Sequence, residues 1–414
     1  MRARNSSPQR TRRTRSLLTG SVLCVLCVLR GGELHAAQEP GAPQSVSADQ
    51  LKAAIDKLGD LDYDTRTAAA RTVRRTAASQ VVPALLQTVA DHADGYVRYR
   101  ALVLLTGFND PRTRDAMRES LASPNDRLRA VAYSFFEHHP DRAMAGDFLA
   151  ALDKEQGEFV RPSLVRTLAA HAAVYDDPRI RQTLVGEVGR GEDYFRSAVI
   201  EAIGDYKARY AYDALVDVAK LDGPLQDDAA LALGKIGDRR ALETLAMLQR
   251  TAPRQVQPAI ATSICLLGSN CESHQHYLAE TLKFAEANEG FQQLLRGAAA
   301  GLGALAIAGG AGRDAEAVDA LFDIGIPSRD PTRAPISLAL GAIALRNTPL
   351  MLSVLSKHAD RDRAIELVAE GFDMLEEDLD KETFFAAARR SYWEAPDGSA
   401  TRQLMQTLIG KLDF

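Results

Sequence analysis

Aromatic residues are scarce in this chain of 414 residues, where they make up 6% of the sequence and include a single tryptophan. Because aromatic and β-branched side chains favour strands, an apolar content carried by Ala, Leu and Val argues against a fold rich in β-sheet. The four cysteines are too few for a fold that depends on disulfide bonds. Hydrophobic residues still account for 46% of the chain, which is enough for a sizeable core. The composition therefore indicates an ordered, helical protein.

Positive charge is not in excess either, because 50 Lys and Arg residues face 55 Asp and Glu residues and give a net charge of −5. This balance argues against a generally basic, nucleic-acid-binding protein. The sequence strings GxSxG, HExxH, GxxxxGK[ST] and GxGxxG are absent, so the usual fingerprints of hydrolases, zinc proteases and nucleotide-binding proteins are missing. The absence of motifs does not by itself exclude an enzyme, but we predict no catalytic residues, no cofactor and no metal site, and a protein that is not an enzyme.

The amino-terminal segment has the pattern of a secretory signal peptide. Residues 1–16 contain six arginines and no acidic residue, and residues 17–29 form an apolar run that is short for a membrane span. Small residues then surround a cleavage point after Ala36. We predict that residues 1–36 are a signal peptide and that residues 37–48, rich in Pro, Ser and Gly, are a flexible leader. The mature protein is then periplasmic or secreted, without stable membrane insertion.

The export route and the mature charge also depend on this segment. Arg12 and Arg13 leave the route open between general secretion and twin-arginine export, although Arg15 stands where twin-arginine signals usually carry a bulky apolar residue. Removal of residues 1–36 takes away seven arginines and one glutamate, so the net charge falls from −5 to −11. The acidic mature chain makes nucleic acid a still poorer candidate as a partner.

One pattern recurs along the rest of the chain. Its clearest copy is residues 225–234, LQDDAALALG, which puts an apolar stripe on one helical face and a glycine at the helix end. A second amphipathic helix, RRALETLAMLQR, follows it. Aligned on Gln226, the equivalent positions recur every 30 to 39 residues, at Arg66, Arg98, Arg129, Arg161, Arg196, Gln226, Gln257, Leu295, Arg333, Arg363 and Arg402. Eleven helical hairpins thus account for residues 49–414.

This pattern resembles the HEAT repeat family, in particular its short bacterial form, over nearly all of the mature chain. The resemblance implies an all-α fold, an α-solenoid of about eleven HEAT-type hairpins, each made of an A helix, a turn and a B helix. In the family, Asp and Arg residues commonly form a ladder between neighbouring repeats, so we interpret the repeated arginines as structural. An acidic residue often stands three positions before them and is well placed to cap the B helix, as at Asp126, Glu158, Asp193, Asp330 and Asp360.

Cys265 and Cys271 flank a Gly-Ser-Asn turn between two predicted helices. In an oxidising compartment we expect a disulfide between them that joins the seventh and eighth hairpins. Reduced thiols are one alternative, and a zinc site that adds His274 and His276 is another, although this spacing matches no common structural zinc site.

Helical periodicity predicts which B-helix residues point away from the core, namely those two, five and nine positions after each aligned residue. In the early hairpins these positions form a basic stripe, which is either a solvated surface or a site for an anionic partner. Its residues are Arg71, Arg75, Arg100, Ser134, His138 and Arg166.

In hairpins seven to ten the same positions become apolar: Ala259, Leu266, Ala300, Ala304, Leu338, Ala342, Ile365, Val368 and Phe372. Since a helix that is apolar on all sides is normally buried, something should cover these residues. Tight curvature, which the many Ala and Gly residues permit, is one explanation. A second copy of the chain and an apolar segment of a partner are the others. If a partner binds here, Leu338, Ile365, Val368 and Phe372 are its predicted contacts.

These observations favour an exported scaffold that binds a protein or peptide in its concave groove, with an apolar segment against the late hairpins and an acidic flank against the basic stripe. Self-association through hairpins seven to ten is a further option. The alternative is a metal-dependent enzyme that uses His138, His139, His171 or the Cys265 region, or an accessory subunit of a periplasmic enzyme complex. The acidic run at residues 376–380 is predicted to be a solvated turn between helices.

Overall fold

A computed structural model describes residues 45–309, 313–375 and 377–414, so the predicted signal peptide and most of the predicted leader lie outside the described residues. The described residues belong to one unit, Pro40–Phe414. Their regular structure consists of helices alone. The α-helices are α1 (Ala48–Asp56), α2 (Tyr63–Arg75), α3 (Ala78–Asp91), α4 (Gly95–Thr106), α5 (Arg112–Ser120), α6 (Asp126–His138), α7 (Ala145–Leu152), α8 (Val160–Tyr175), α9 (Pro178–Glu187), α10 (Asp193–Asp205), α11 (Tyr212–Ala219), α12 (Gln226–Lys235), α13 (Ala241–Thr251), α14 (Gln257–Leu266), α15 (Cys271–Ala287), α16 (Gln292–Ala308), α17 (Asp314–Gly325), α18 (Arg333–Arg346), α19 (Thr348–Lys357), α20 (Arg361–Met374), α21 (Asp378–Glu394) and α22 (Ala400–Lys411). Four short 3₁₀ helices, Lys57–Gly59, Arg142–Met144, Arg209–Ala211 and Arg254–Val256, connect some of them.

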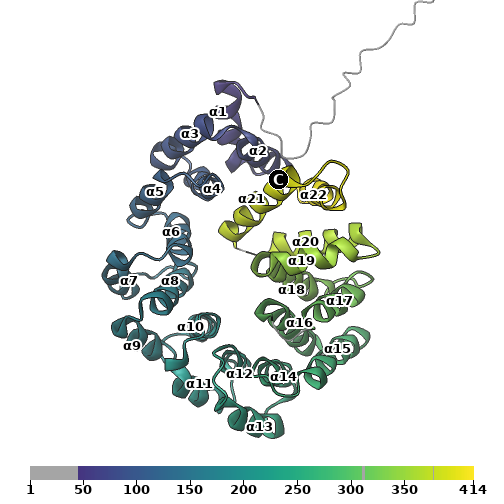
Figure 1. Ribbon diagram of the computed structural model, residues 1–414. Coiled ribbons are helices and arrows are strands. Elements are labelled where there is room, and N and C mark those ends of the chain that lie inside the picture. The colour runs from purple at the N-terminus through teal and green to yellow at the C-terminus, as the bar shows by residue number, and fades with distance from the viewer. Residues whose placement is uncertain (1–44, 310–312, 376) are drawn as a thin grey trace, which may run out of the picture. The chain divides into compact units, whose positions relative to one another are not determined.

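The helices pair into eleven successive hairpins from α1–α2 to α21–α22, which confirms the predicted all-α solenoid. Each odd-numbered helix is an A helix and each even-numbered helix is a B helix. Along the arc from α3 to α18 the B helices form the inner layer and the A helices the outer layer (Figure 1). Each of the eleven aligned residues lies in a B helix. The repeat read from the sequence is therefore the repeat of the structure.

The aligned arginines have a repeated structural contact. In the second hairpin, Arg98 Nε donates to the carbonyl oxygen of Val89 at 2.7 Å, near the end of α3. A cation at a helix carboxyl end satisfies unpaired carbonyl groups and interacts favourably with the helix dipole. The equivalent contact to the end of the A helix recurs for Arg196 with Val188, Gln226 with Ala219, Arg333 with Gly325 and Arg402 with Ala395. These contacts support the structural interpretation of the repeated residue.

The predicted acidic caps are only partly correct. Asp360 accepts a hydrogen bond from the Arg363 amide and caps α20 as expected. In the third hairpin, however, the cap is Asn125, whose extended backbone lets its side chain reach the Arg127 amide. Asp126 is instead the first helical residue, and its carboxylate pairs with Arg129 at 2.6 Å.

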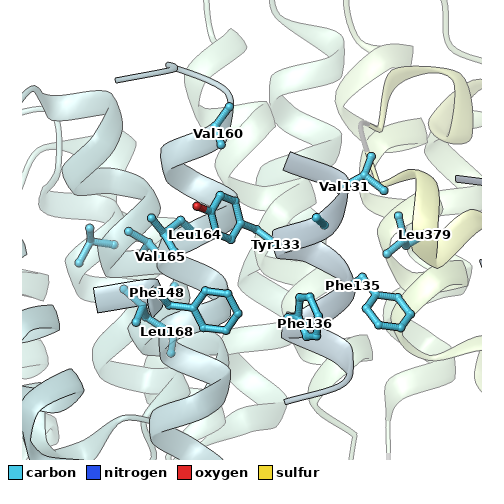
Figure 2. Packing of buried hydrophobic residues seen from close by; sticks show 14 of the residues in the cluster. Val131, Tyr133, Phe135, Phe136, Phe148, Val160, Leu164, Val165, Leu168 and Leu379 are labelled. Atoms are coloured by element: carbon cyan, nitrogen blue, oxygen red, sulfur yellow. The ribbon is translucent and has the colours of Figure 1, made fainter. Parts of the chain in front are cut away.

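Buried apolar side chains form two clusters that follow one another along the solenoid. The first runs from Leu51 to Leu267 and also includes Leu379, and the second runs from Ala261 to Phe414. Figure 2 shows part of the first cluster, in which Phe148 packs edge-to-face with Tyr133 and Leu379 lies on the other side of α6 beside Phe135. A residue of the last hairpin thus completes a core that belongs to the early hairpins.

Glycines allow the late B helices to approach closely. A Cβ at Gly371 of α20 would lie 2.1 Å from the carbonyl oxygen of Ser337 and 3.0 Å from the Cα of Gly341 in α18. A Cβ at Gly301 of α16 would lie 2.4 Å from Thr262 Oγ1 in α14. Neither distance is compatible with a larger residue unless the helices move. The close approach that the Ala and Gly content permits is present between these B helices.

Among the described residues, no single helix has both the length and the hydropathy of a membrane span. Helices α18 and α19 meet both criteria only when they are counted together as one segment, and the chain bends by 116° between them.

The last hairpin also contacts the first three hairpins. Helix α21 packs against α18 on one side and against α4 and α6 on the other. Six residues of α2, α4 and α6 bond to residues of α20, of the last hairpin, or to Asp413 and Phe414 beyond it. The solenoid therefore closes on itself within this unit. The prediction of a solvated turn is wrong for Asp378 and Asp380, which take part in the closure, and Glu376 lies outside the described residues.

Candidate functional site

The predicted basic stripe lies on the inner layer, but most of it is paired within the chain. Arg71 forms an ion pair with Asp413, and an Arg75 guanidinium nitrogen donates to the Phe414 backbone oxygen at 2.9 Å. Arg100 lies 3.5 Å from the Asp378 carboxylate. The acidic flank that the sequence assigned to a partner is supplied by the carboxyl-terminal part of the same chain.

The most deeply buried of these contacts was missed from the sequence. Arg74 donates from Nε and a terminal nitrogen to both carboxylate oxygens of Glu382, at 2.6 to 3.0 Å. The two side chains are only 7% and 2% exposed. Periodicity places Arg74 off the open face of its helix, so it was not a candidate. The four-residue spacing of Asp378 and Glu382 was the available signal, because it puts two acids on one face of a helix.

Helix α21 makes further polar contacts near its start. The Tyr99 hydroxyl donates to Asp378, and His138 Nε2 lies 3.2 Å from Asp380 Oδ1. Burial raises the pKa of Asp378, but Arg100 and the Tyr99 hydrogen bond outweigh it and leave that pKa below its usual value. Burial dominates at Asp380, where the pKa is raised in spite of His138. Asp378 therefore stays ionised and forms a charged contact with the early hairpins.

Arg166, the remaining residue of the predicted stripe, belongs to a different network. It bonds to Glu137 of α6 at 2.9 Å and to Asp205 of α10 at 3.0 Å. Lys235 of α12 bonds to Asp205 at 2.7 Å, and the Tyr206 hydroxyl donates to Glu137 at 2.7 Å. Four consecutive B helices are thereby linked by alternating charges. This is a ladder between neighbouring repeats, of the kind that the HEAT resemblance implied.

Three of the predicted apolar contacts are not accessible. Ile365 and Val368 are fully buried and Phe372 is 4% exposed. The Phe372 ring packs against Phe384 and Phe385 of α21, with ring centroids 5.0 and 6.2 Å apart. The expectation that something covers these residues holds, but the prediction that they contact a partner is wrong, because the last hairpin of the chain itself folds over α20.

Leu338 is different, because 41% of its surface is exposed. Its helix, α18, is covered on three sides: Ile336 lies against Gly325 of α17, Ala339 lies against Gly303 of α16, and Ser337 lies against Gly371 of α20. Leu338 points to the remaining, inner side. The corresponding positions on α14, α16 and α18 are also apolar and at least partly exposed. We call this set the inner apolar surface: Leu266, Ala300, Ala304, Leu338 and Ala342.

Three of the residues named for a metal or redox role, Cys265, Cys271 and His171, are engaged in other contacts. Cys265 and Cys271 form a disulfide between α14 and α15, as expected. His171 is fully buried, its Nδ1 lies 2.8 Å from the Thr167 carbonyl oxygen, and its Nε2 accepts from the Asp141 amide. Burial lowers the pKa of His171, which suits the neutral ring of this bonding pattern. Among the residues that the structure describes, no group of three or more His, Cys, Asp or Glu side chains is placed to hold a metal ion.

One carboxyl group on the inner layer, that of Asp228, has a raised pKa. The Ser197 hydroxyl donates to Asp228 Oδ2 at 2.6 Å, across α10 and α12. Burial raises the pKa of Asp228 to about 6, and the nearby charges of Asp227 and Glu201 act in the same direction. The group therefore titrates in a range where exposed carboxylates stay charged.

The geometry defines an α-solenoid of HEAT-type hairpins with a partly exposed apolar inner face. Residues 51–136 match the family model described as HEAT repeats. No curated protein matches the chain.

Three solved structures illustrate its structural similarity. The complex of CpcE and CpcF of phycocyanin lyase from Nostoc sp. PCC7120 is 20% identical, with 64% of this chain and 97% of that chain covered and a TM-score of 0.39. Importin beta is 15% identical, with 87% and 55% covered and a TM-score of 0.37. The karyopherin Kap121p, bound to the extreme carboxyl terminus of the phosphatase Cdc14p, is 13% identical, with 88% and 46% covered and a TM-score of 0.32.

Proposed function

We propose that the protein is an exported scaffold without catalytic activity of its own, and that it binds an apolar segment of a partner protein on the inner apolar surface. The exposed Leu338 side chain on the inner side of α18 carries this proposal. An apolar side chain of this size gains free energy when a partner removes it from water, by about 25 cal/mol for each Å² buried.

The surroundings of Leu338 suit such a partner. Ala300, Ala304 and Ala342 present short side chains on the neighbouring turns and helices, and they leave room for a larger apolar side chain of the partner. HEAT-type stacking holds these positions on a rigid, continuous surface. The disulfide at Cys265 suits an oxidising compartment and thus supports export, together with the predicted signal peptide.

The closure of the solenoid changes the partner that we expect. Because Asp378 and Asp413 already neutralise Arg100 and Arg71, an acidic flank on the partner is no longer needed. The partner chemistry that remains is a short apolar segment.

The test is affinity capture from an extract of the native compartment with wild-type protein and with Leu338→Asp. We expect the variant to lose a partner that the wild-type protein retains, because an aspartate would have to be desolvated in the interface. Leu221→Asp is the matched control, since Leu221 is 61% exposed in the turn between α11 and α12 and lies away from the inner apolar surface.

Circular dichroism and size-exclusion chromatography should give the same helix content and size for both variants. Capture that is equal for wild type and Leu338→Asp would contradict the proposal. Loss of a self-associated form in Leu338→Asp alone would show that the apolar segment comes from a second copy of the chain.

A further inference from the structure

Four arginines meet where the first and last hairpins touch. Arg71, Arg74 and Arg75 come from the carboxyl-terminal half of α2 and Arg389 comes from α21. Burial lowers the pKa of Arg75, and the charges of Arg71, Arg389 and Arg74 all lower it further. The acidic side chains bonded to this set are Glu382, which pairs with Arg74, and Asp413, which pairs with Arg71. Two of the four guanidinium groups are thus paired with a carboxylate side chain, and Arg75 instead donates from one terminal nitrogen to the Phe414 backbone oxygen at 2.9 Å.

The helix register explains how Arg389 reaches this place. Asp378, Glu382, Phe385 and Arg389 follow one another at three- and four-residue spacing and therefore lie along one face of α21. The first two contact Arg100 and Arg74, and the Phe385 ring lies under the Arg74 guanidinium at 5.0 Å and stacks on Phe414 at 4.2 Å. Arg389 is one turn further along the same face.

Two guanidinium groups of the set are not satisfied. The Nη1 atom of Arg389 and the Nε atom of Arg75 are buried and have no hydrogen-bond partner. Burial lowers the pKa of both arginines, and the charge of Arg74 adds to that effect on each. Both carboxylate oxygens of Glu382 already accept hydrogen bonds from Arg74, and neither accepts one from Arg75 or Arg389. A buried donor without an acceptor is unfavourable, and a charged one more so.

We propose that this junction is a binding site for a compact oxyanion of the phosphate or sulfate class, held between α2 and α21 by Arg75 and Arg389. Guanidinium groups suit this ligand because their N–H donors match the oxygen spacing of a tetrahedral oxyanion. The Arg71 and Asp413 side chains are 34% and 43% exposed, so this edge of the junction is open to solvent.

The bound oxyanion has a structural consequence. It bridges the first and last hairpins, and its negative charge offsets the repulsion among the four arginines. It therefore stabilises the closed solenoid. The inference is independent of the proposed partner on the inner apolar surface.

The experiment measures the thermal unfolding of the purified protein in inorganic phosphate and in chloride at equal ionic strength. We expect phosphate to raise the Tm of the wild-type protein, because a ligand that binds only the folded state stabilises it. The Arg389→Gln variant should lose this rise. Arg390→Gln is the matched control, because it removes the same charge from the next, exposed residue and should keep the response.

The Tm of the variants in chloride distinguishes a role of Arg389 in binding from a merely structural role. In chloride, Arg389→Gln should have a Tm equal to or above that of the wild type, since it removes a buried cation that lacks a full partner. Arg389→Lys, which keeps the charge but not the fork of donors, should retain a reduced phosphate response and covers the case in which Arg389→Gln does not fold.

Titration calorimetry with inorganic phosphate and with phosphoethanolamine distinguishes a free ion from the phosphate of a larger molecule. Heat of binding that disappears in Arg389→Gln supports the site with either probe. A wild-type Tm that is the same in phosphate and in chloride, or a phosphate response that Arg389→Gln retains in full, would overturn the proposal.

Discussion

Arg74 and Glu382 form a buried ion pair at 2.6 Å although 308 residues separate them in the chain. They connect the second helix of the solenoid to the second-last helix. A HEAT array is usually a one-dimensional stack in which each repeat contacts only its neighbours. Here the last repeat also contacts the first three, so the ends of the stack are not free.

Glu382→Ala should strongly destabilise the junction between α2 and α21. It leaves the Arg74 guanidinium buried without a partner, and loss of one member of a buried pair costs about 3 to 5 kcal/mol. Urea unfolding monitored by hydrogen exchange of α2 and α21 measures the effect. Asp110→Ala, which breaks a pair between Asp110 and Arg112 at the surface, is the control and should change stability far less, because a solvated ion pair contributes little. Equal midpoints for the two variants would contradict the role of the buried pair.

Gly371→Ala should loosen the packing of α18 on α20. The new methyl group would lie 2.1 Å from the Ser337 carbonyl oxygen, so the helices must separate, at a cost of about 1 to 3 kcal/mol. Gly410→Ala is a matched control because a Cβ at Gly410 meets no atom within 4 Å and the position is helical. It should stabilise the protein by about 0.5 to 1 kcal/mol. Differential scanning calorimetry should show Tm shifts of opposite sign for the two variants.

Asp228 should make stability depend on pH between its unfolded and folded pKa values. Its folded pKa of about 6 exceeds the ordinary aspartate value of 3.8, so the folded state binds the proton more tightly. The stabilisation that the protonated group provides is therefore complete at low pH and is lost as pH rises towards 6. Asp228→Asn should raise stability at pH 7 by about 1 to 2 kcal/mol, because the amide oxygen still accepts from Ser197 and carries no charge.

The check is a series of urea unfolding curves from pH 3 to pH 7, a range that includes both pKa values. The difference between wild type and Asp228→Asn should grow with pH. A difference that stays constant over this range would show that Asp228 does not titrate there.

Reduction of the Cys265–Cys271 disulfide should destabilise the joint between the seventh and eighth hairpins. The two cysteines are 6 residues apart, and the loop-entropy relation for a ring of that size gives about 2 kcal/mol. Cys265→Ser with Cys271→Ser should lower the Tm under oxidising conditions to the value that the wild type shows in dithiothreitol. A wild-type Tm that does not respond to dithiothreitol would contradict this expectation.

The parts of the fold that depend on local pattern were predictable. The spacing of Arg98, Arg129 and their equivalents gave the hairpins, because each hairpin buries its apolar stripe against its nearest neighbours. Cys265 and Cys271 could be paired because only a short turn separates their helices. Among the predicted binding residues, Leu338 lies on the open face that helical periodicity assigned to it.

The parts that depend on long-range packing were not predictable in the same way. Val368 occupies the same repeat position as Leu338, and Phe372 lies one turn further along the same face, yet both are buried because the last hairpin covers their helix. Arg71 and Arg100 follow the predicted face too, but their partners are acids more than 270 residues away. Nothing in the periodicity of a B helix indicates which distant helix will lie across it.

The sequence by itself determined the helical hairpins, their number and the faces that they bury, since these follow from contacts within a hairpin and with the next one. The tertiary structure decided that α21 returns to α2, α4 and α6. The physical reason is that closure depends on the small rotation between successive hairpins, summed over eleven of them. The same closure gathers Arg75 and Arg389 at one junction and leaves Leu338 on the inner face.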